Sequence, residues 1–283
     1  MILTALAVAA LLGQATPSTP PAAETVPAAE TAKPAADAVT PPPPPPPPPV
    51  DPWKGNVGFG LIALTGNANA VTLTTNVGAD KKWSGWGIGI RANAAYGQSQ
   101  PTASASPEVV ALRAGLSLKG ERDLTDWISL FIAGAAETDH VKSMEYRATG
   151  EAGAGFTVLN EKVEDLEKMF LKFDLAFRYS HESRYQYYPT PMGLPTADIV
   201  APRIGLVFRY AFNKAIRFSE EAETILNFLG SFRALINSNT KLSARLTEAL
   251  AVNVAFLVTE DTLPAPGKKQ ADTALTVGLE ASF

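Results

Sequence analysis

The amino-acid sequence predicts an all-β fold, a closed antiparallel transmembrane β-barrel of about twelve strands. Three observations predict it. Apolar residues recur with a period of two in segments of about ten or more residues. Prolines are absent from those segments. The longer connections follow odd-numbered segments, as expected when short turns and long loops lie at opposite ends of a barrel.

The N-terminal 52 residues contain none of the chain's 24 aromatic residues, so the core-forming part begins at Trp53. The apolar run from Met1 to Leu12, followed by the small residues Gly13 and Ala15, predicts a signal peptide over 1–15. That run is too short to span a bilayer as a helix.

A disordered Pro/Ala-rich linker is expected over 16–52, because a segment with so much proline and no aromatic residue cannot bury a core. Its nine consecutive prolines, Pro41–Pro49, predict a polyproline II rod of about 28 Å, suited to a spacer in the periplasm. Contact with the cell wall or a periplasmic partner is the alternative. The barrel is expected over 53–283.

Composition excludes several classes of protein. A net charge of −4 with 18% charged residues argues against nucleic acid as a partner. The absence of cysteine excludes disulfides, thiolate zinc sites, a thiol nucleophile and a lipoprotein anchor. No later segment has 18 uninterrupted apolar residues, so helical membrane spans are not expected.

Alternation is clearest between Met169 and Tyr179, where Leu, Phe and Tyr alternate with charged or small residues. Read in this way, the chain gives twelve strands near 53–65, 69–82, 85–97, 108–121, 126–139, 144–159, 167–182, 203–212, 214–225, 231–246, 249–260 and 272–283. The segments Glu220–Glu223 and Ala244–Leu246 also suit a helix. Ten or fourteen strands therefore remain open.

Prolines support closure of the barrel. Beyond Pro52 all eight lie in or at the edge of three long connections, 98–107, 183–202 and 261–271. Because proline cannot donate to a strand ladder, it is excluded from the middle of a closed sheet. Two connections depart from the expected asymmetry, since 160–166 is a longish inner turn and 65–68 is a short outer one.

The two faces of the strands predict an inside and an outside. The face with Leu, Val, Phe and Trp should meet lipid, because a charge there costs about 2–4 kcal/mol near the midplane. The other face supplies the candidate lumen-lining residues Arg91, Arg113, Lys119, Arg147, Glu151, Lys172, Asp174, Arg178, Arg209, Arg233 and Glu280. Such a mixed lumen can close by ion pairing or line a wet pore. A soluble periplasmic or secreted barrel, binding a small apolar ligand inside its apolar face, is the alternative, although twelve strands would overfill one small cavity.

The sequence offers no catalytic, cofactor or metal site, and no enzyme is predicted. The two histidines, His140 and His181, are expected as solvated rim residues at the outer ends of strands. An outer-membrane hydrolase depending on either histidine is a second alternative. Tyr185, Tyr187 and Tyr188 are expected in the longest outer loop as interface or packing residues.

The last strand alternates through Leu275, Val277 and Leu279 to a terminal Phe283. This ending resembles the signal that the barrel assembly machinery recognises, so that machinery is an expected partner.

The opening Trp53–Gly60, the turn Leu64–Ala70 and the segment Asp272–Leu279 resemble the DUF481 family, also called YdiY-like or salt-induced outer-membrane proteins. The resemblance implies a barrel in the cell outer membrane, in contact with its lipid, whose biochemical role is undefined. A small-solute pore or an envelope component fits both the strand pattern and the family resemblance. Neither assigns a substrate.

Overall fold

A computed structural model describes residues 53–64, 69–100, 106–164, 166–188, 190–228 and 230–283. The expected signal peptide and Pro-rich linker lie outside the described residues. The described part holds twelve strands: β1 (Lys54–Leu64), β2 (Asn69–Trp83), β3 (Trp86–Gln100), β4 (Glu108–Asp123), β5 (Ile128–Asp139), β6 (Met144–Val163), β7 (Leu166–Gln186), β8 (Met192–Ala211), β9 (Ile216–Asn227), β10 (Arg233–Arg245), β11 (Leu250–Asp261) and β12 (Ala271–Ser282). None of these residues forms a helix long and apolar enough to cross a membrane.

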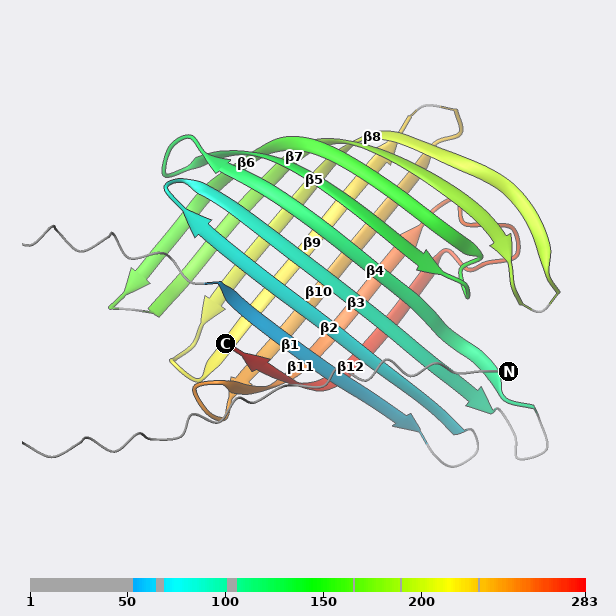
Figure 1. Ribbon diagram of the computed structural model, residues 1–283, viewed down its shortest axis with the longest axis horizontal. Coiled ribbons are helices and arrows are strands. Elements are labelled where there is room, and N and C mark those ends of the chain that lie inside the picture. Colours follow the sequence, from blue (N-terminus) through cyan, green and yellow to red (C-terminus); the bar gives the residue numbers. More distant parts are fainter. Residues whose placement is uncertain (1–52, 65–68, 101–105, 165, 189, 229) are drawn as a thin grey trace, which may run out of the picture. The chain divides into compact units, whose positions relative to one another are not determined.

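The strands close into one antiparallel barrel in which each strand pairs with its sequence neighbours. The first and last strands, β1 and β12, complete the ring side by side (Figure 1). Their register runs from Asn56 opposite Ser282 to Gly60 opposite Gly278. Beyond it, the backbone N–H of Phe283 donates to Gly55 O at 2.9 Å, and the N–H of Gly55 donates back at 2.8 Å. The predicted closed twelve-stranded fold is therefore confirmed.

The segments that also suited a helix are not helical: Glu220–Glu223 is in a strand, and Ala244 and Arg245 end β10, with Leu246 just after it. Glu220–Glu223 lies within β9, paired with β8 and β10 over its length. A strand places neighbouring residues on opposite faces, so Glu221 and Glu223 share one face and Glu220 takes the other. Tertiary pairing on both sides outweighs the local helical tendency of this run.

One predicted boundary is wrong. The chain from 183 to 202 is not a loop: β7 continues to Gln186 and β8 begins at Met192. Pro195 and Pro202 consequently lie inside β8. They are tolerated because the ladder between β8 and β9 begins only at Arg203, so the outer part of β8 pairs with β7 alone and has a free edge. There the side-chain oxygen of Asn227 accepts the Val200 N–H at 3.3 Å.

The connection between β6 and β7 is also shorter than predicted. The strands run to Val163 and from Leu166, so the exception at 160–166 disappears. The turn between β2 and β3 uses Ser84 and Gly85, both with positive φ (41° and 76°), as a two-residue hairpin requires. We call the end of the barrel with these short turns and Phe283 the inner end, and the opposite one the outer end.

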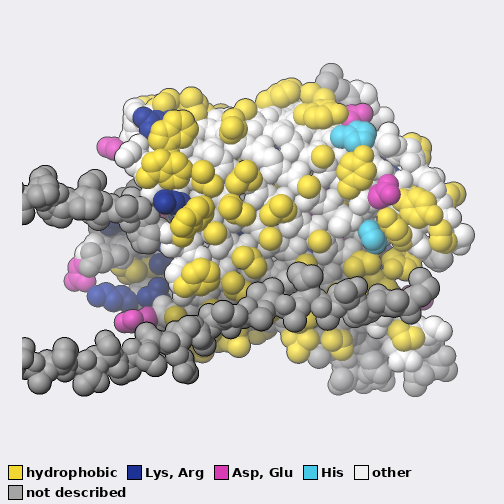
Figure 2. Space-filling view, in the orientation of Figure 1, with side chains coloured by type: hydrophobic (Ala, Val, Ile, Leu, Met, Phe, Trp, Pro, Cys, Tyr) yellow, Lys and Arg dark blue, Asp and Glu magenta, His cyan; other side chains and the backbone are white. Residues whose placement is uncertain are grey.

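Apolar side chains cover the outside of the barrel. Ile132 is 69% exposed and Phe59 is 59% exposed. Figure 2 shows hydrophobic side chains over the middle of one face, with charged ones toward its ends. Exposed tryptophans, Trp53, Trp83 and Trp127 among them, lie at the inner end, where an aromatic girdle of a membrane barrel belongs. The alternative of an apolar interior is therefore wrong.

Candidate functional site

Ion pairs between strands that are not neighbours identify the face that points into the lumen. Lys119 on β4 lies 3.5 Å from Asp174 on β7. Arg178 on β7 bonds Glu223 on β9 at 3.0 Å. Since β4 and β7 are separated by two strands, and β7 and β9 by one, such contacts can form only across the interior. The charged face of the strands is the inner face.

Four charged side chains form a central cluster in the lumen: Glu151, Arg178, Arg203 and Glu223. Arg178 Nε donates to Glu151 at 2.7 Å. Arg203 Nε donates to Glu223 at 2.6 Å, and Asn237 Nδ2 donates to Glu223 at 2.8 Å. Each ion has at least one opposite charge within hydrogen-bonding distance, which is what allows it to leave bulk water. The cluster ties β6, β7, β8 and β9 together.

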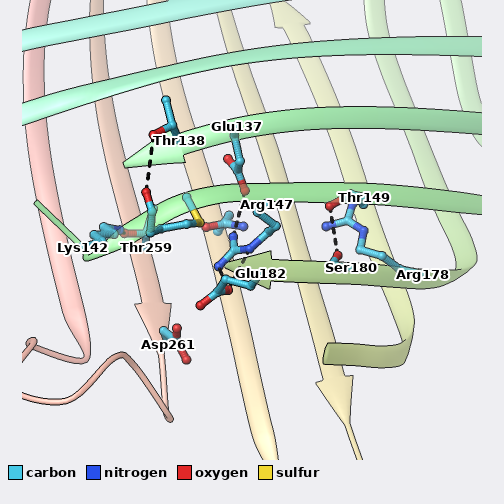
Figure 3. A network of polar contacts seen from close by, with 12 residues as sticks. Glu137, Thr138, Lys142, Arg147, Thr149, Arg178, Ser180, Glu182, Thr259 and Asp261 are labelled. Atoms are coloured by element: carbon cyan, nitrogen blue, oxygen red, sulfur yellow. Dashed lines mark hydrogen bonds and ion pairs between the residues drawn. The ribbon is translucent and has the colours of Figure 1, made fainter. Parts of the chain in front are cut away.

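A second group, the outer cluster, lies toward the outer end and comprises Arg147, Glu182, Arg184, Arg233 and Asp261. Glu182 accepts from Arg147 at 2.6 Å, from Arg184 at 2.5 Å and from Arg233 at 3.4 Å. Arg233 also bonds Asp261 at 2.5 Å. The side chains of Glu182 and Arg233 are each only 4% exposed. Figure 3 shows Arg147 lying against Glu182, with Asp261 nearby on another strand.

A third group, the inner cluster, comprises Lys119, Glu121, Lys172 and Asp174. The Lys172 ammonium bonds Glu121, and Lys119 lies 3.4 Å from the same carboxylate. Ser129 Oγ donates to Glu121 at 2.5 Å. The three clusters follow one another along the β4–β11 side of the barrel. Acidic and basic groups are equal in number in the central and inner clusters, and the third arginine of the outer cluster is offset by Glu137, which lies 2.8 Å from Arg147.

The opposite wall of the lumen is uncharged at mid-height. Cross-strand partners there include Gly58 with Asn76 and Thr72 with Gly97. A Cβ added at Gly58 would meet the Asn76 side chain, and one at Gly97 would meet Thr72. Glycine therefore makes room for the neighbouring amide and hydroxyl. At this height the lumen therefore has one charged wall and one wall of small polar residues, while the pairs Arg91–Asp80 and Glu280–Lys241 lie nearer the inner end.

Three cavities follow the lumen. The outer one, of about 470 Å³, and the middle one, of about 440 Å³, share Thr149 and Arg178 in their walls. The middle one and an inner cavity of about 190 Å³ share Glu221. The wall of the middle cavity includes Lys82, Gly87 and Asp123, so it also reaches the inner end, beside the inner cavity. Arg178 therefore stands between the first two hollows, and Glu221 stands between the second and the third.

The candidate lumen residues distribute over these spaces. Arg113, Arg147, Arg178 and Arg233 line the outer cavity; Arg91, Lys119, Glu151 and Asp174 line the middle one; Arg209 and Glu280 line the inner one; Lys172 belongs to the inner cluster. Arg91 is bound to Asp80 at 2.8 Å, Arg209 to Glu167 at 3.3 Å, and Glu280 to Lys241 at 3.3 Å.

The sequence analysis missed six members of the clusters: Glu121, Glu182, Arg184, Arg203, Glu223 and Asp261. All six lie at or near a predicted strand end, or in the segment that also suited a helix. A usable signal was present, because Arg203 has the same parity as Arg209 along one strand and Glu182 has the same parity as Arg178. The strands extend beyond the residues at which the outward-facing positions stop being apolar, and the inward-facing charged residues continue there.

The histidines and tyrosines lie at the outer end. His140, in the turn after β5, stacks on Tyr187 with ring centroids 3.8 Å apart. Tyr187 in turn contacts Tyr185, which belongs to β7 and not to a loop. Partial burial raises the pKa of the Tyr187 phenol above its usual value, and the Glu145 carboxylate adds to this effect.

His181 lies within β7 and faces outward, where its Nδ1 lies 2.9 Å from the register partner Asp198. Tyr179 also donates to that carboxylate, at 3.0 Å. Ser183 Oγ donates to Glu145 at 2.7 Å. Over the described ranges no three His, Asp or Glu side chains are grouped so that they could hold a metal ion.

Residues 57–283 match the family model described as a protein of unknown function, DUF481. The chain belongs to the DUF481 family. Comparison with curated proteins gives no match for this DUF481 protein. Among solved structures it is similar to the NanC porin, at 10% identity over 81% of this chain and 99% of that one, with a TM-score of 0.47. An outer membrane channel from Pseudomonas putida F1 gives 8% identity, 83% and 96% coverage and a TM-score of 0.47. The translocator domain of autotransporter NalP from Neisseria meningitidis is 11% identical over 82% of this chain and 88% of that one, with a TM-score of 0.42.

Proposed function

We propose that this DUF481 protein lies in the cell outer membrane and passes small polar solutes through its lumen. The observation that carries the proposal is a set of three cavities that share wall residues and together extend from the outer end of the lumen to the inner end. A barrel with a packed interior would lack such spaces. The charged and amide side chains around the cavities favour water and polar solutes over apolar ligands.

The central cluster is the proposed constriction. Arg178 belongs to both the outer and the middle cavity, and its guanidinium is held by Glu151 and Glu223. The eleven lumen residues predicted from the sequence would tune which solutes pass. Because most of their charges are already paired, we expect weak discrimination by net charge.

The test is conductance of the purified full chain in planar lipid bilayers. We expect discrete openings for the wild type and a larger single-channel conductance for Arg178→Ala, which removes the group between two cavities. Arg122→Ala is the matched control, since Arg122 lies on the outer face over the Trp86 ring and lines none of the three cavities. Wild-type protein that folds, as judged by its gel mobility, but never conducts would refute the pore.

Location and assembly belong to the same proposal. The apolar outer face suits outer-membrane lipid, and the strand ending in Phe283 suits the barrel assembly machinery. The segment 16–52 would then lie in the periplasm, where contact with cell wall or a partner is open to it. Envelope fractionation, together with gel mobility before and after boiling, tests this placement; recovery in the soluble periplasm without a mobility shift contradicts it.

We also propose that the protein is not an enzyme. The one histidine paired with a carboxylate in the described part of the chain is His181, with Asp198. The hydroxyl group of Ser183, two residues along the strand, donates a hydrogen bond to Glu145 instead. A nucleophilic mechanism needs the serine bonded to the base. Esterase activity that His181→Ala abolishes would overturn this inference.

A further inference from the structure

The turn between β5 and β6, residues 140–143, lies at the outer mouth of the lumen. Backbone hydrogen bonds fix it to the strand on each side. The N–H of His140 donates to Leu112 O on β4 at 3.0 Å. On the other side, the N–H of Tyr185 on β7 donates to Ser143 O at 3.1 Å. The turn therefore has a fixed position at the edge of the outer cavity.

The side chain of Lys142 reaches from this turn to the opposite wall of the barrel. Its ammonium group donates to Thr259 Oγ1 on β11 at 2.9 Å (Figure 3). It also lies 3.1 Å from the carboxylate of Asp272 on β12. Thr259 and Asp272 are register partners, so both point into the lumen at the same level. In the twelve-stranded ring β5 and β11 are six positions apart, as are β6 and β12. Lys142 therefore joins walls that face each other.

The connection between β11 and β12 narrows the same mouth. Pro264 and Ala265 line the outer cavity, and Ala265 is only 5% exposed. The N–H of Thr262 donates to Ala234 O on β10 at 3.0 Å, which holds the start of the connection against the barrel wall. Two sides of the mouth are thus narrowed, and Lys142 spans the space between the turn on one side and the strands that carry this connection on the other.

We propose that Lys142, held by Thr259 and Asp272, forms a bar across the outer mouth that sets the largest solute able to enter the outer cavity. The inference rests on the proposed pore and adds a second constriction, which selects by size and lies nearer the outer end than the central cluster. A compact solute can pass beside the bar. A bulky one can enter only when the ammonium group leaves both partners.

The bar can be removed without unfolding the barrel. The side chains of Lys142 and Asp272 are 42% and 52% exposed. An ion pair as exposed as this contributes little to folding stability. The backbone hydrogen bonds of the turn do not involve the Lys142 side chain, so they persist in Lys142→Ala. This substitution should therefore widen the mouth while the surrounding strands keep their positions.

The chain has no cysteine, so a single introduced thiol reports entry into the lumen. Ala135→Cys suits this purpose, because Ala135 lines both the outer and the middle cavity. The measured quantity is the rate at which a bulky thiol reagent modifies the purified, folded protein, divided by the rate for a compact reagent of the same charge. Lys142→Ala should raise this ratio about tenfold, because entry no longer requires breaking one hydrogen bond and one exposed ion pair. Lys142→Arg, which can bond the same two partners, should keep the ratio low.

The matched control is Lys269→Ala, which removes the same charge from the wall of the same cavity. The Lys269 side chain forms no ion pair or hydrogen bond with the residues that the structure describes, so its loss should leave the ratio unchanged. Gel mobility before boiling verifies that each variant folds. An unchanged ratio in Lys142→Ala, or an equal rise in Lys269→Ala, would overturn the proposal. The labelling does not depend on conductance: a protein that labels as expected but never conducts refutes the pore alone, and a conducting protein whose ratio ignores Lys142 refutes the bar alone.

Discussion

The central cluster gives the sharpest prediction, the effect of neutralising Glu223 by the isosteric substitution Glu223→Gln. This carboxylate accepts hydrogen bonds from Arg203 at 2.6 Å, from Asn237 at 2.8 Å and from Arg178 at 3.0 Å. The amide keeps the shape of the side chain but removes the charge. Two guanidinium groups then face each other with less negative charge between them.

The expected loss of folding stability can be estimated from the carboxylate partners that each arginine keeps in the variant. Arg178 keeps Glu151 at 2.7 Å, whereas the remaining carboxylates near Arg203 are 3.7 and 3.9 Å away. Removing one partner of a buried ion pair costs about 3–5 kcal/mol. Because Arg203 is 15% exposed and Glu223 20% exposed to the lumen, water screens part of the penalty. We expect the free energy of unfolding to fall by about 2–3 kcal/mol.

Urea unfolding of the purified protein in detergent micelles measures this change, with the folded fraction read from gel mobility without boiling. Glu164→Gln is the control, because its partner Lys214 lies 3.3 Å away and both side chains are more than 70% exposed, at 73% and 81%. It should cost about 0.2–0.5 kcal/mol. If Glu223→Gln and Glu164→Gln lose the same free energy within error, the central cluster does not stabilise the barrel.

Three further substitutions test the outer face and the strand ends. Ile132→Lys, on the outer face with 69% exposure, should lower the free energy of unfolding in lipid by about 2–4 kcal/mol. Ala133→Lys, on the lumen face, should lower it by less than half as much. Equal losses for the two variants would contradict the assignment of faces. Phe283→Ala, at a residue 79% exposed, should reduce the amount of protein in the outer membrane without changing the unfolding of the purified barrel. Pro202→Ala should change the free energy of unfolding by less than about 1 kcal/mol, because β8 has a free edge at that level; a larger loss in the same urea titration would show that the proline itself is needed.

The fold was predictable because the barrel imposes a simple pattern on the sequence. A membrane strand must be apolar on one face, and a closed barrel requires this of every strand, so the period of two recurs twelve times. Strand ends were less predictable. Above the membrane the outer face no longer needs apolar residues, so the alternation in Ser183–Tyr185 fades while the hydrogen-bonded ladder of β7 continues. Pro195 and Pro202 added a false boundary, because a free edge cannot be recognised from one sequence.

The lumen clusters were predictable in part. The alternation of neighbouring residues between the two faces of a strand is enough to place Arg178 and Asp174 on the inner face. Their partners come from strands that are not neighbours, and pairing across the interior depends on the tilt and closure of the barrel. Glu121 meets Lys172 from β7, a contact between residues 51 positions apart that no local pattern encodes.

The run Glu220–Glu223 joins these arguments, because the feature that made it resemble a helix is the feature that gives β9 acidic residues on both faces. A strand that only lined a pore would carry polar residues on one face, and its outer face would be apolar. In β9 the acidic residues continue across both faces: Glu223 neutralises two arginines inside the lumen, and Glu220 faces lipid with only hydroxyl partners. Since the two carboxyl groups point in opposite directions from one strand, their effects should separate. Glu223→Gln should lower the free energy of unfolding and change the conductance, whereas Glu220→Leu should leave the central cluster and the conductance unchanged.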